Sequence, residues 1–414
     1  MECMVPARPE TTVIAVLRSA LVSASDAPPL DLLSAFAAVP DPRRAQGRRF
    51  ALPAILALAV SALLANHLSV LAIAQWGARQ RPALLQTLGF RDGTTPHQST
   101  VQRLFRVLDP AALSAAISGY FAAALPAPTQ RGEQGVAIEG KAQRGRLAFA
   151  TTAGGTVHAL TAYSHEAGIV LAQQEIRSTA AKVEAELTVA PALIARLDWR
   201  GRVMTGDALF CQRHLCTQLR EAGGDYVLLV KGNQPTLHAD LALLFDPPAD
   251  GHRSLPLLDR REAVTVERGH GRTHDRRHLL ATTDLTHYLN WPGLAQVFRL
   301  ERSWRAHGQA YGAIHYGITS LPPDVADAAR LLALKRGHWR IANGLHYRKD
   351  VVFGEDRCQI RLGAGPMILA TLRDTALSLL QTTGCRHVAA RLRHYGQHPG
   401  AVVALLHRPT TQNA

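Results

Sequence analysis

The stretch GVAIEGKAQRGR, residues 135–146, marks the point at which the sequence pattern changes from helical to alternating. Val136 and Ile138 alternate with small residues, which is typical of a strand in a buried sheet. A carboxylate, Glu139, ends the apolar run, and cations follow it at Lys141, Arg144 and Arg146. The stretch predicts a first strand that brings an acid to the edge of a sheet, with positive charge beside it.

Four later segments also have the length and composition of strands. They are TVHALTAYS (156–164), GIVLAQQEI (168–176), GRVMTGDALF (201–210) and DYVLLVKGNQ (225–234). Helical patterns at 181–198 and 212–224 precede the last two. Three antiparallel strands followed by two helix–strand units predict an α/β fold, an RNase H-like mixed sheet flanked by helices.

Changes of pattern elsewhere predict how the rest of the chain is divided. Apolar residues recur at helical spacing before the Pro- and Gly-bearing linker LPAPTQRGEQG (125–135). Within that helical part, residues 95–110 predict a helix capped by Ser99 or Thr100, with arginines that face either DNA or solvent. The predicted order is a loose tail at 1–26, a helical N-terminal domain at 27–125, a first part of the core at 135–245, a β-rich insertion at 246–325, a C-terminal helical part of the core at 326–398 and a loose tail at 399–414.

Composition limits the class of protein and its partners. The 414 residues are 47% hydrophobic and 19% charged, which excludes a disordered chain. Lysine and arginine number 46 against 32 acids, a net charge of +14 that favours nucleic acid as partner over a membrane. The alternative is an arginine-rich soluble protein without a polyanionic ligand.

Cysteines and apolar runs indicate the compartment. The five cysteines are scattered and odd in number, which fits neither a zinc site nor a disulfide framework and suits a reducing cytoplasm. The longest apolar run, 51–65, is too short to span a membrane and predicts a buried helix.

Two predicted strands end in acids, Glu139 on the first and Asp207 on the fourth. These strands are neighbours in a sheet of the predicted order, so the two carboxylates would converge. Because like charges repel at short range, such a pair favours a divalent cation, and oxygen ligands favour Mg²⁺ or Mn²⁺. Taken singly, each acid is as well explained as a strand-end cap or a surface charge.

Three basic segments are candidates for contact with DNA. The helical segment 335–349 combines five cations with aromatic residues, and we expect Arg336, His338, Trp339, Arg340 and Arg348 to contact DNA. A strand end supplies Lys231, Asn233 and Gln234, and the segment 267–278 supplies Arg272. Lys141 and Arg144 follow the first acid. The alternatives are a solvated basic helix face, a polar turn and a basic hairpin.

An ordered set of motifs is similar to the H-repeat-associated family of bacterial insertion-sequence transposases of the DDE type. The resemblance covers residues 30–385. It includes DPRRAQGRRF, TPHQSTVQRLF, IEGKAQRG, GDAL, AGGDYVLLVKGNQPTLH, ERGHGR, RGHWRIANGLHYRKDVVFGED and LRDTALSLL. The resemblance implies an RNase H-like catalytic core split by a β-rich insertion. It also implies binding to terminal inverted repeats, a homodimer on DNA, and DNA cleavage and strand transfer with two Mg²⁺ ions held by Asp, Asp and Glu.

The sequence departs from that acidic triad. The first family aspartate falls on Glu139, the second on Asp207, and the third position, a glutamate in the family, is Ala342. A further family glutamate falls on His274. Because alanine supplies no ligand, we expect Glu139 and Asp207 to hold any metal and catalysis to be impaired. The alternative is a DNA-binding relic or repressor that no longer cuts.

Overall fold

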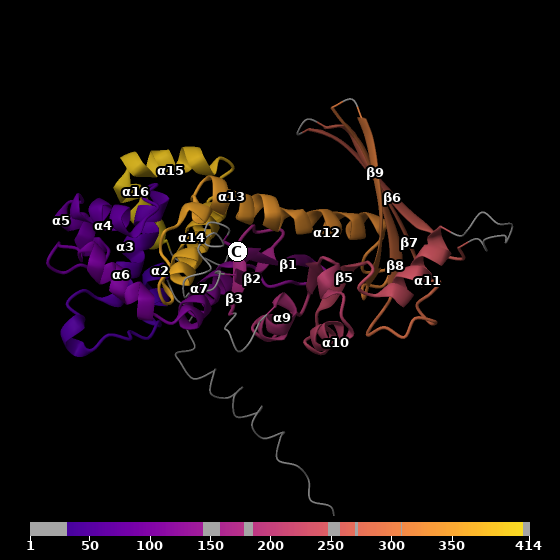
Figure 1. Cartoon of the computed structure of the whole chain (residues 1–414), viewed down its shortest axis with the longest axis horizontal. Coiled ribbons are helices and arrows are strands. Elements are labelled where there is room, and N and C mark those ends of the chain that lie inside the picture. The colour runs from indigo at the N-terminus through magenta and orange to yellow at the C-terminus, as the bar shows by residue number, and fades with distance from the viewer. Residues whose placement is uncertain are drawn as a thin grey trace, which may run out of the picture.

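The computed structural model describes residues 31–143, 158–177, 185–246, 257–269, 272–307 and 309–408. The predicted loose tail at 1–26 and the cations Arg144 and Arg146 lie outside these residues. A single mixed sheet of nine strands runs through the molecule in the order β3-β2-β1-β4-β5-β9-β8-β7-β6. Figure 1 shows a helical bundle at one end, strands β6 to β9 at the other, and a long helix, α12, between them.

The first five strands form the half of the sheet beside the bundle. They are β1 (Gln134–Ala142), β2 (His158–Ser164), β3 (Val170–Ile176), β4 (Arg202–Gly206) and β5 (Asp225–Val230). Strand β2 pairs antiparallel with both β1 and β3, whereas β1, β4 and β5 run parallel. The predicted strand order is confirmed, and β1 and β4 are direct neighbours.

Strands β6 to β9 extend the same sheet. They are β6 (Arg261–Gly269), β7 (Arg272–Thr282), β8 (Gln296–Ala306) and β9 (Gln309–Thr319). All four pair antiparallel with their neighbours, and β9 joins the group to β5. The strands predicted for the 246–325 segment therefore continue the sheet.

The N-terminal helices form a bundle around one buried helix. They are α2 (Leu32–Ala37), α3 (Leu52–Leu64), α4 (Val70–Ala78), α5 (Pro82–Thr87), α6 (Gln98–Val107) and α7 (Pro110–Ala124), with the short 3-10 turn η1 (Ala45–Gly47). Helix α3 buries nearly every side chain and packs on α2, α4 and α14. By length and composition alone 45–64 could cross a membrane, but most of this apolar stretch is already buried by the bundle.

The remaining helices flank the sheet and complete the bundle. They are α9 (Glu186–Ala195), η2 (Ala208–Phe210), α10 (Arg213–Glu221), α11 (Pro235–Phe245), α12 (Ala328–Arg340), the π-helical η3 (Ile341–His346), α13 (Tyr347–Val351), η4 (Glu355–Arg357), α14 (Gly365–Thr382), α15 (Val388–Gln397) and α16 (Pro399–Leu406). Helix α12 packs against β1, β4, β5, β6 and β7, so it crosses both halves of the sheet (Figure 1).

Two predictions about helix ends are wrong. Helix α6 is capped by His97, whose Nδ1 accepts from the Ser99 amide, because the chain turns helical two residues before the expected cap. The second error concerns residues 399–408, which were expected to be loose. They form α16, because Val402 and Leu406 are fully buried where α16 packs on α3 and α5.

Candidate active site and nucleic-acid interface

Glu139 and Asp207 emerge side by side from neighbouring parallel strands. In the register of β1 and β4, Ala137 lies opposite Thr205, and each acid follows its strand partner by two residues. The carboxyl ends of parallel strands share one edge of a sheet, so both side chains reach the same place. The structure therefore brings together the two acids that the sequence singled out.

Both acids line one cavity of about 410 Å³, here called the acidic pocket. Its walls also contain Glu186, Lys231 and Lys335. Glu186 comes from the first turn of α9, and its Oε1 lies 3.1 Å from His158 Nε2, from which it accepts a hydrogen bond when that nitrogen carries the proton. A Cβ at position 140 would collide with this carboxylate, so Gly140 lets Glu186 lie close to β1. Sequence reasoning missed Glu186, because only the folded packing of α9 on β2 and β3 brings it here.

Burial and nearby negative charge disfavour ionisation of Glu139. Burial, followed by the charges of Asp207 and Glu186, raises the pKa of Glu139 to about 7, against the opposing effect of Lys335. His346 Nδ1 lies 3.9 Å from Glu139 Oε2, but burial lowers the pKa of His346 to about 3, so this imidazole is neutral. A cation beside Glu139 would therefore relieve a real electrostatic cost.

Lys335 is the only lysine on α12, and it points inward. Its residue is 6% exposed, and it lies on the buried face of the helix with Leu331 and His338. Burial lowers the pKa of Lys335 to about 8, while Asp207 and Glu139 act in the opposite direction. Its ammonium makes no hydrogen bond or ion pair with any residue that the structure describes.

Ala342 lies in η3, the π-helical segment that follows α12. It is not part of the acidic pocket wall. Across the described ranges, no group of three or more histidine, cysteine, aspartate or glutamate side chains is arranged to hold a metal ion. Asp350 and Glu355, the nearest later acids, are held by lysines at 2.7 Å (Lys141) and 3.2 Å (Lys349), so neither replaces a carboxylate at position 342.

Asn233 and Gln234 hold the segment that carries Asp207. The Asn233 amide donates to the Ala208 carbonyl at 2.6 Å, and the Gln234 amide donates to the Cys211 carbonyl at 2.9 Å. Asp207 itself accepts from the Leu209 amide at 2.9 Å. Both amide side chains, which the sequence places among the expected DNA contacts, lie against the backbone just after β4.

A buried chain of hydrogen bonds fixes His338, which also lines the acidic pocket. Thr205 Oγ1 lies 3.0 Å from His165 Nε2 and 3.2 Å from His338 Nδ1. Burial is the main cause that lowers the pKa of both histidines, to about 3 for His165 and well below its usual value for His338. Because His165 also fills the space beside Gly135 and Gly337, this chain links β1, β4 and α12.

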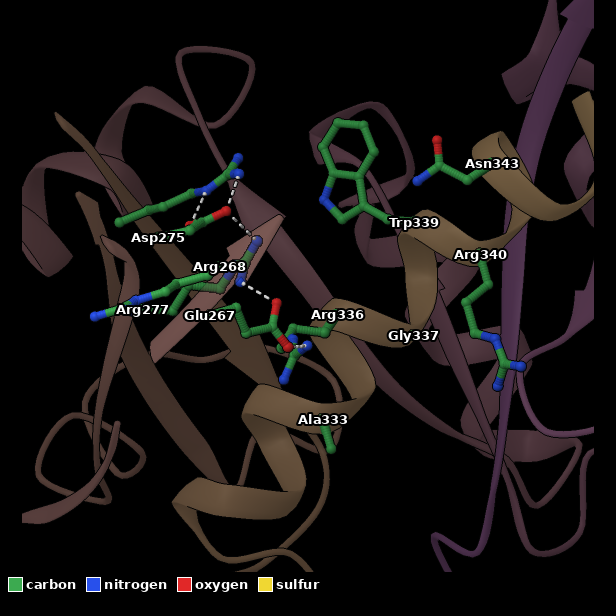
Figure 2. A pocket seen from close by; sticks show the side chains of 11 residues that line it. Glu267, Arg268, Asp275, Arg277, Ala333, Arg336, Gly337, Trp339, Arg340 and Asn343 are labelled. Atoms are coloured by element: carbon green, nitrogen blue, oxygen red, sulfur yellow. Dashed lines mark hydrogen bonds and ion pairs between the residues drawn. The ribbon is translucent and has the colours of Figure 1, made fainter. Parts of the chain in front are cut away.

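A second cavity, the arginine cleft, lies between α12 and the outer strands and has a volume of about 600 Å³. Its lining includes Arg268, Arg277, Arg302, Arg336 and Arg340, with Glu267, Asp275, Trp339 and Asn343. Asp275 accepts from Arg302 at 2.7 and 2.9 Å and from Arg277 at 3.0 Å, and Glu267 pairs with Arg336. Figure 2 shows Glu267 beside Arg336, and the Trp339 indole that projects from α12.

A third cavity of about 310 Å³ continues past α12 and is lined by Tyr163, Gly168, Arg336, Trp339, Arg340, Asn343, Gly344, Arg348 and Gln381. Trp339 and Arg336 line all three cavities. Trp339 is 61% exposed, although tryptophan usually buries most of its surface. The acidic pocket therefore opens beside a continuous cationic surface that centres on an exposed aromatic ring.

Of the remaining candidate residues, the structure describes the side chain of Lys141 alone. The Lys141 ammonium is held by Asp350 at 2.7 Å, with Glu355 and Asp356 within 4 Å. Arg144 lies outside the described residues, and the side chains of Arg272 and His274 do as well. Within the described part, Lys141 is thus engaged in an ion-pair cluster away from the acidic pocket.

Two family models match most of the chain. The model of the transposase DDE domain matches residues 130–379, more than half of the chain, and a DDE-transposase-associated model matches residues 33–121. The chain therefore belongs to the transposase DDE domain family. The resemblance to H-repeat-associated transposases is confirmed by its relatives.

Three relatives illustrate this similarity. An uncharacterized protein in the dhlA 3′ region of Xanthobacter autotrophicus is 33% identical over 70% of this chain and 94% of its own length. The putative transposase YncI of Escherichia coli O157:H7 is 29% identical over 84% of this chain and 87% of its own length. The H repeat-associated putative transposase YhhI of E. coli K12 is 25% identical over 84% of this chain and 90% of its own length. A piggyBac transposase synaptic complex with hairpin DNA matches with a TM-score of 0.38 and 10% identity, over 94% of this chain and 80% of that chain.

Proposed function

We propose that this protein binds double-stranded DNA at the terminal inverted repeats of its element, as a transposase whose cleavage chemistry is impaired. Its reaction class is metal-dependent phosphodiester cleavage and strand transfer. The observation that carries the proposal is the single pocket in which Glu139 and Asp207 meet beside the cationic surface of α12. Paired acids next to clustered arginines suit chemistry on a polyanion.

The strand order supports an RNase H-like core. Strands β3-β2-β1-β4-β5 form the five-stranded half, with β2 antiparallel to β1 and with β4 and β5 parallel to it. Strands β6 to β9 come between β5 and α12 in the sequence, where a β-rich insertion would split such a core. This arrangement puts the candidate acids on neighbouring strands and the cationic helix over them.

The acidic pocket supplies two of the carboxylate ligands, Glu139 and Asp207, that one Mg²⁺ or Mn²⁺ ion would need. Burial, and after it the neighbouring carboxylates of Asp207 and Glu186, raises the pKa of Glu139, and Mg²⁺ is commonly bound by one or two carboxylates plus substrate phosphates. When bound, the ion would polarise a phosphate and neutralise charge as the phosphodiester bond breaks. The third carboxylate that the family supplies is replaced by the methyl group of Ala342.

Three features of the chain's own residues would serve DNA binding. Arg340 and Arg348 line the third cavity and make no ion pair with other described residues, so they are available to phosphates. The Trp339 ring offers an exposed face for stacking. Asn233 and Gln234 keep Asp207 in position through the backbone that follows it.

Ala342 also supports a second candidate function, a DNA-binding protein that no longer cuts, such as a relic or a repressor. Both functions predict binding to DNA, in the cytoplasm on the nucleoid, by a homodimer that joins two element ends. They differ only in whether the acidic pocket still breaks a phosphodiester.

A nicking assay separates the two functions. The full chain is incubated with a labelled duplex of its element's end in Mg²⁺ or Mn²⁺, beside Ala342→Glu and Ala342→Glu/Glu139→Asp variants. We expect binding without nicking by the unmodified chain and nicking by the double variant, because a misplaced or missing catalytic group costs on the order of 10²-fold or more. Nicking by the unmodified chain that disappears in Asp207→Asn would instead show an intact catalyst.

A further inference from the structure

Two buried lysines, Lys335 on α12 and Lys349 on α13, differ in whether an acid pairs with them. Lys349 is 3% exposed and is held by Asp374 at 2.8 Å and by Glu355 at 3.2 Å. Lys335 is 6% exposed and has no such partner among the described residues. Buried ammonium groups are normally paired, because leaving water is costly without a compensating anion.

The cavity that Lys335 lines leaves room for the missing partner. The acidic pocket has a volume of about 410 Å³, and its cationic side chains are Lys231, Arg277, Arg302, Lys335 and Arg336. Asp275 and Glu267 already hold the three arginines. The two lysines are the cations of this wall without an ion pair within the described ranges, and Lys231 is exposed at the strand end.

The surroundings of Lys335 favour an anion that arrives with a longer polyanion. The pocket adjoins the arginine cleft and the third cavity, because Arg336 and Trp339 line all three. A DNA strand that follows this surface would pass the mouth of the pocket. A chloride ion or a small carboxylate would fill the acidic pocket alone and would not extend into the arginine cleft or the third cavity.

We propose that Lys335 is a phosphodiester ligand: its ammonium, with Lys231 in the same pocket, receives the non-bridging oxygens of one DNA phosphate beside Glu139 and Asp207. This inference rests on the proposed DNA-binding function and adds the residue that draws one phosphate into the acidic pocket. The site depends on the ammonium and not on a carboxylate at position 342. It therefore engages DNA even in a chain that does not cut.

A protection experiment tests the position of the phosphate directly. The full chain is treated with formaldehyde and a borane reductant, and methylation of individual lysines is measured by mass spectrometry. The probe is thymidylyl-thymidine, which carries one phosphodiester, and the control is thymidine, which carries none. We expect the dinucleotide to reduce methylation of Lys335 several-fold, thymidine to have no effect, and Lys349 to be unaffected by both.

Substitutions test the contribution of Lys335 to DNA binding. Lys335→Met keeps an unbranched side chain one heavy atom shorter and removes its charge, and Lys335→Arg restores a cation. Fluorescence anisotropy with a labelled duplex, over a series of salt concentrations, should show weaker binding and a salt slope reduced by roughly 0.9 for the methionine variant. The arginine variant should keep most of the slope, and circular dichroism checks that both variants fold.

The outcomes separate this inference from the proposed function. If Lys335→Met binds the duplex with unchanged affinity and slope while Arg340→Ala binds more weakly, DNA binding stands and the role of Lys335 is wrong. If the full chain binds no duplex at all, the proposed function fails, and protection of Lys335 by the dinucleotide still decides whether its ammonium takes a phosphate. Equal methylation of Lys335 with and without saturating dinucleotide overturns the inference.

Discussion

At the scale of single residues, the candidate site combines acids and lysines, and only some of their positions could be predicted from the sequence. The convergence of Glu139 and Asp207 could be predicted, because strand order alone makes β1 and β4 neighbours. Lys335 was read as one of several cations on a basic helix, yet its spacing from Leu331 and His338 places it on the buried face. The ion pair of Lys141 could not be predicted from the sequence, because its partner Asp350 is 209 residues away.

The pKa of Glu139 predicts a pH-dependent effect of removing its charge. A carboxyl whose pKa rises from 4.5 to about 7 on folding stabilises the protein fully below pH 4.5, and this contribution is lost as the pH rises through 7. Glu139→Gln cannot ionise, so we expect its melting temperature to exceed that of the unmodified chain at pH 8 and to match it near pH 4.5. Thermal unfolding in metal-free buffer measures both. A difference that does not change with pH would show that Glu139 titrates normally.

At the scale of elements, α12 and the segments after it hold the site together. The π-helical η3 follows α12 directly and carries both Ala342 and His346, and π-bulges of this kind are frequent at functional sites. The sequence predicted one continuous helix here, because a π-turn has no signature in the apolar spacing. The position of Glu186 in the acidic pocket could not be predicted either, since its approach to Glu139 depends on Gly140 and on the packing of α9.

The contact between α12 and His165 predicts that Gly337→Ala is destabilising. Alanine in a helix interior normally gains about 1 kcal/mol over glycine, but here its Cβ would collide with the His165 imidazole. Overpacking of this kind costs about 1–3 kcal/mol, so the net effect should be a loss. Urea denaturation measures this change in the free energy of unfolding. Gly119 in α7 has no atom within 4 Å of an added Cβ, so Gly119→Ala should stabilise, and a gain at both positions would contradict the packing described for α12.

The ion pairs of Lys349 predict a large effect of removing its charge. Lys349 lies between α13, η4 and α14, and without it Asp374 would be left buried with no ion pair to a described residue, while Glu355 would keep Lys141 and Arg373 within 4 Å. Removal of one partner from a buried pair costs about 3–5 kcal/mol, so Lys349→Met should lose that much free energy of unfolding. Denaturant titration provides the measurement, with Arg200→Ala as the exposed control that should be neutral. A small loss for Lys349→Met would mean that this cluster is hydrated.

At the scale of the whole molecule, one sheet joins a helical bundle to four outer strands, and α12 crosses both halves. The sequence predicted most strands and helices, because their periodicity is local. It missed α16, since that helix forms only against α3 and α5. It also could not show that one exposed tryptophan would join three cavities into a single cationic surface.

The most direct test of the central claim is DNA binding by a charge-matched pair of double variants. Arg340→Ala/Arg348→Ala removes two cations from the surface around Trp339, and Arg386→Ala/Arg393→Ala removes two exposed cations outside it. Anisotropy with a labelled duplex should show a strong loss of affinity and a salt slope lowered by up to roughly 1.8 for the first variant alone, because each lost phosphate contact removes about 0.9. Equal losses in the two variants would show that DNA is held by net charge rather than by the surface beside the acidic pocket.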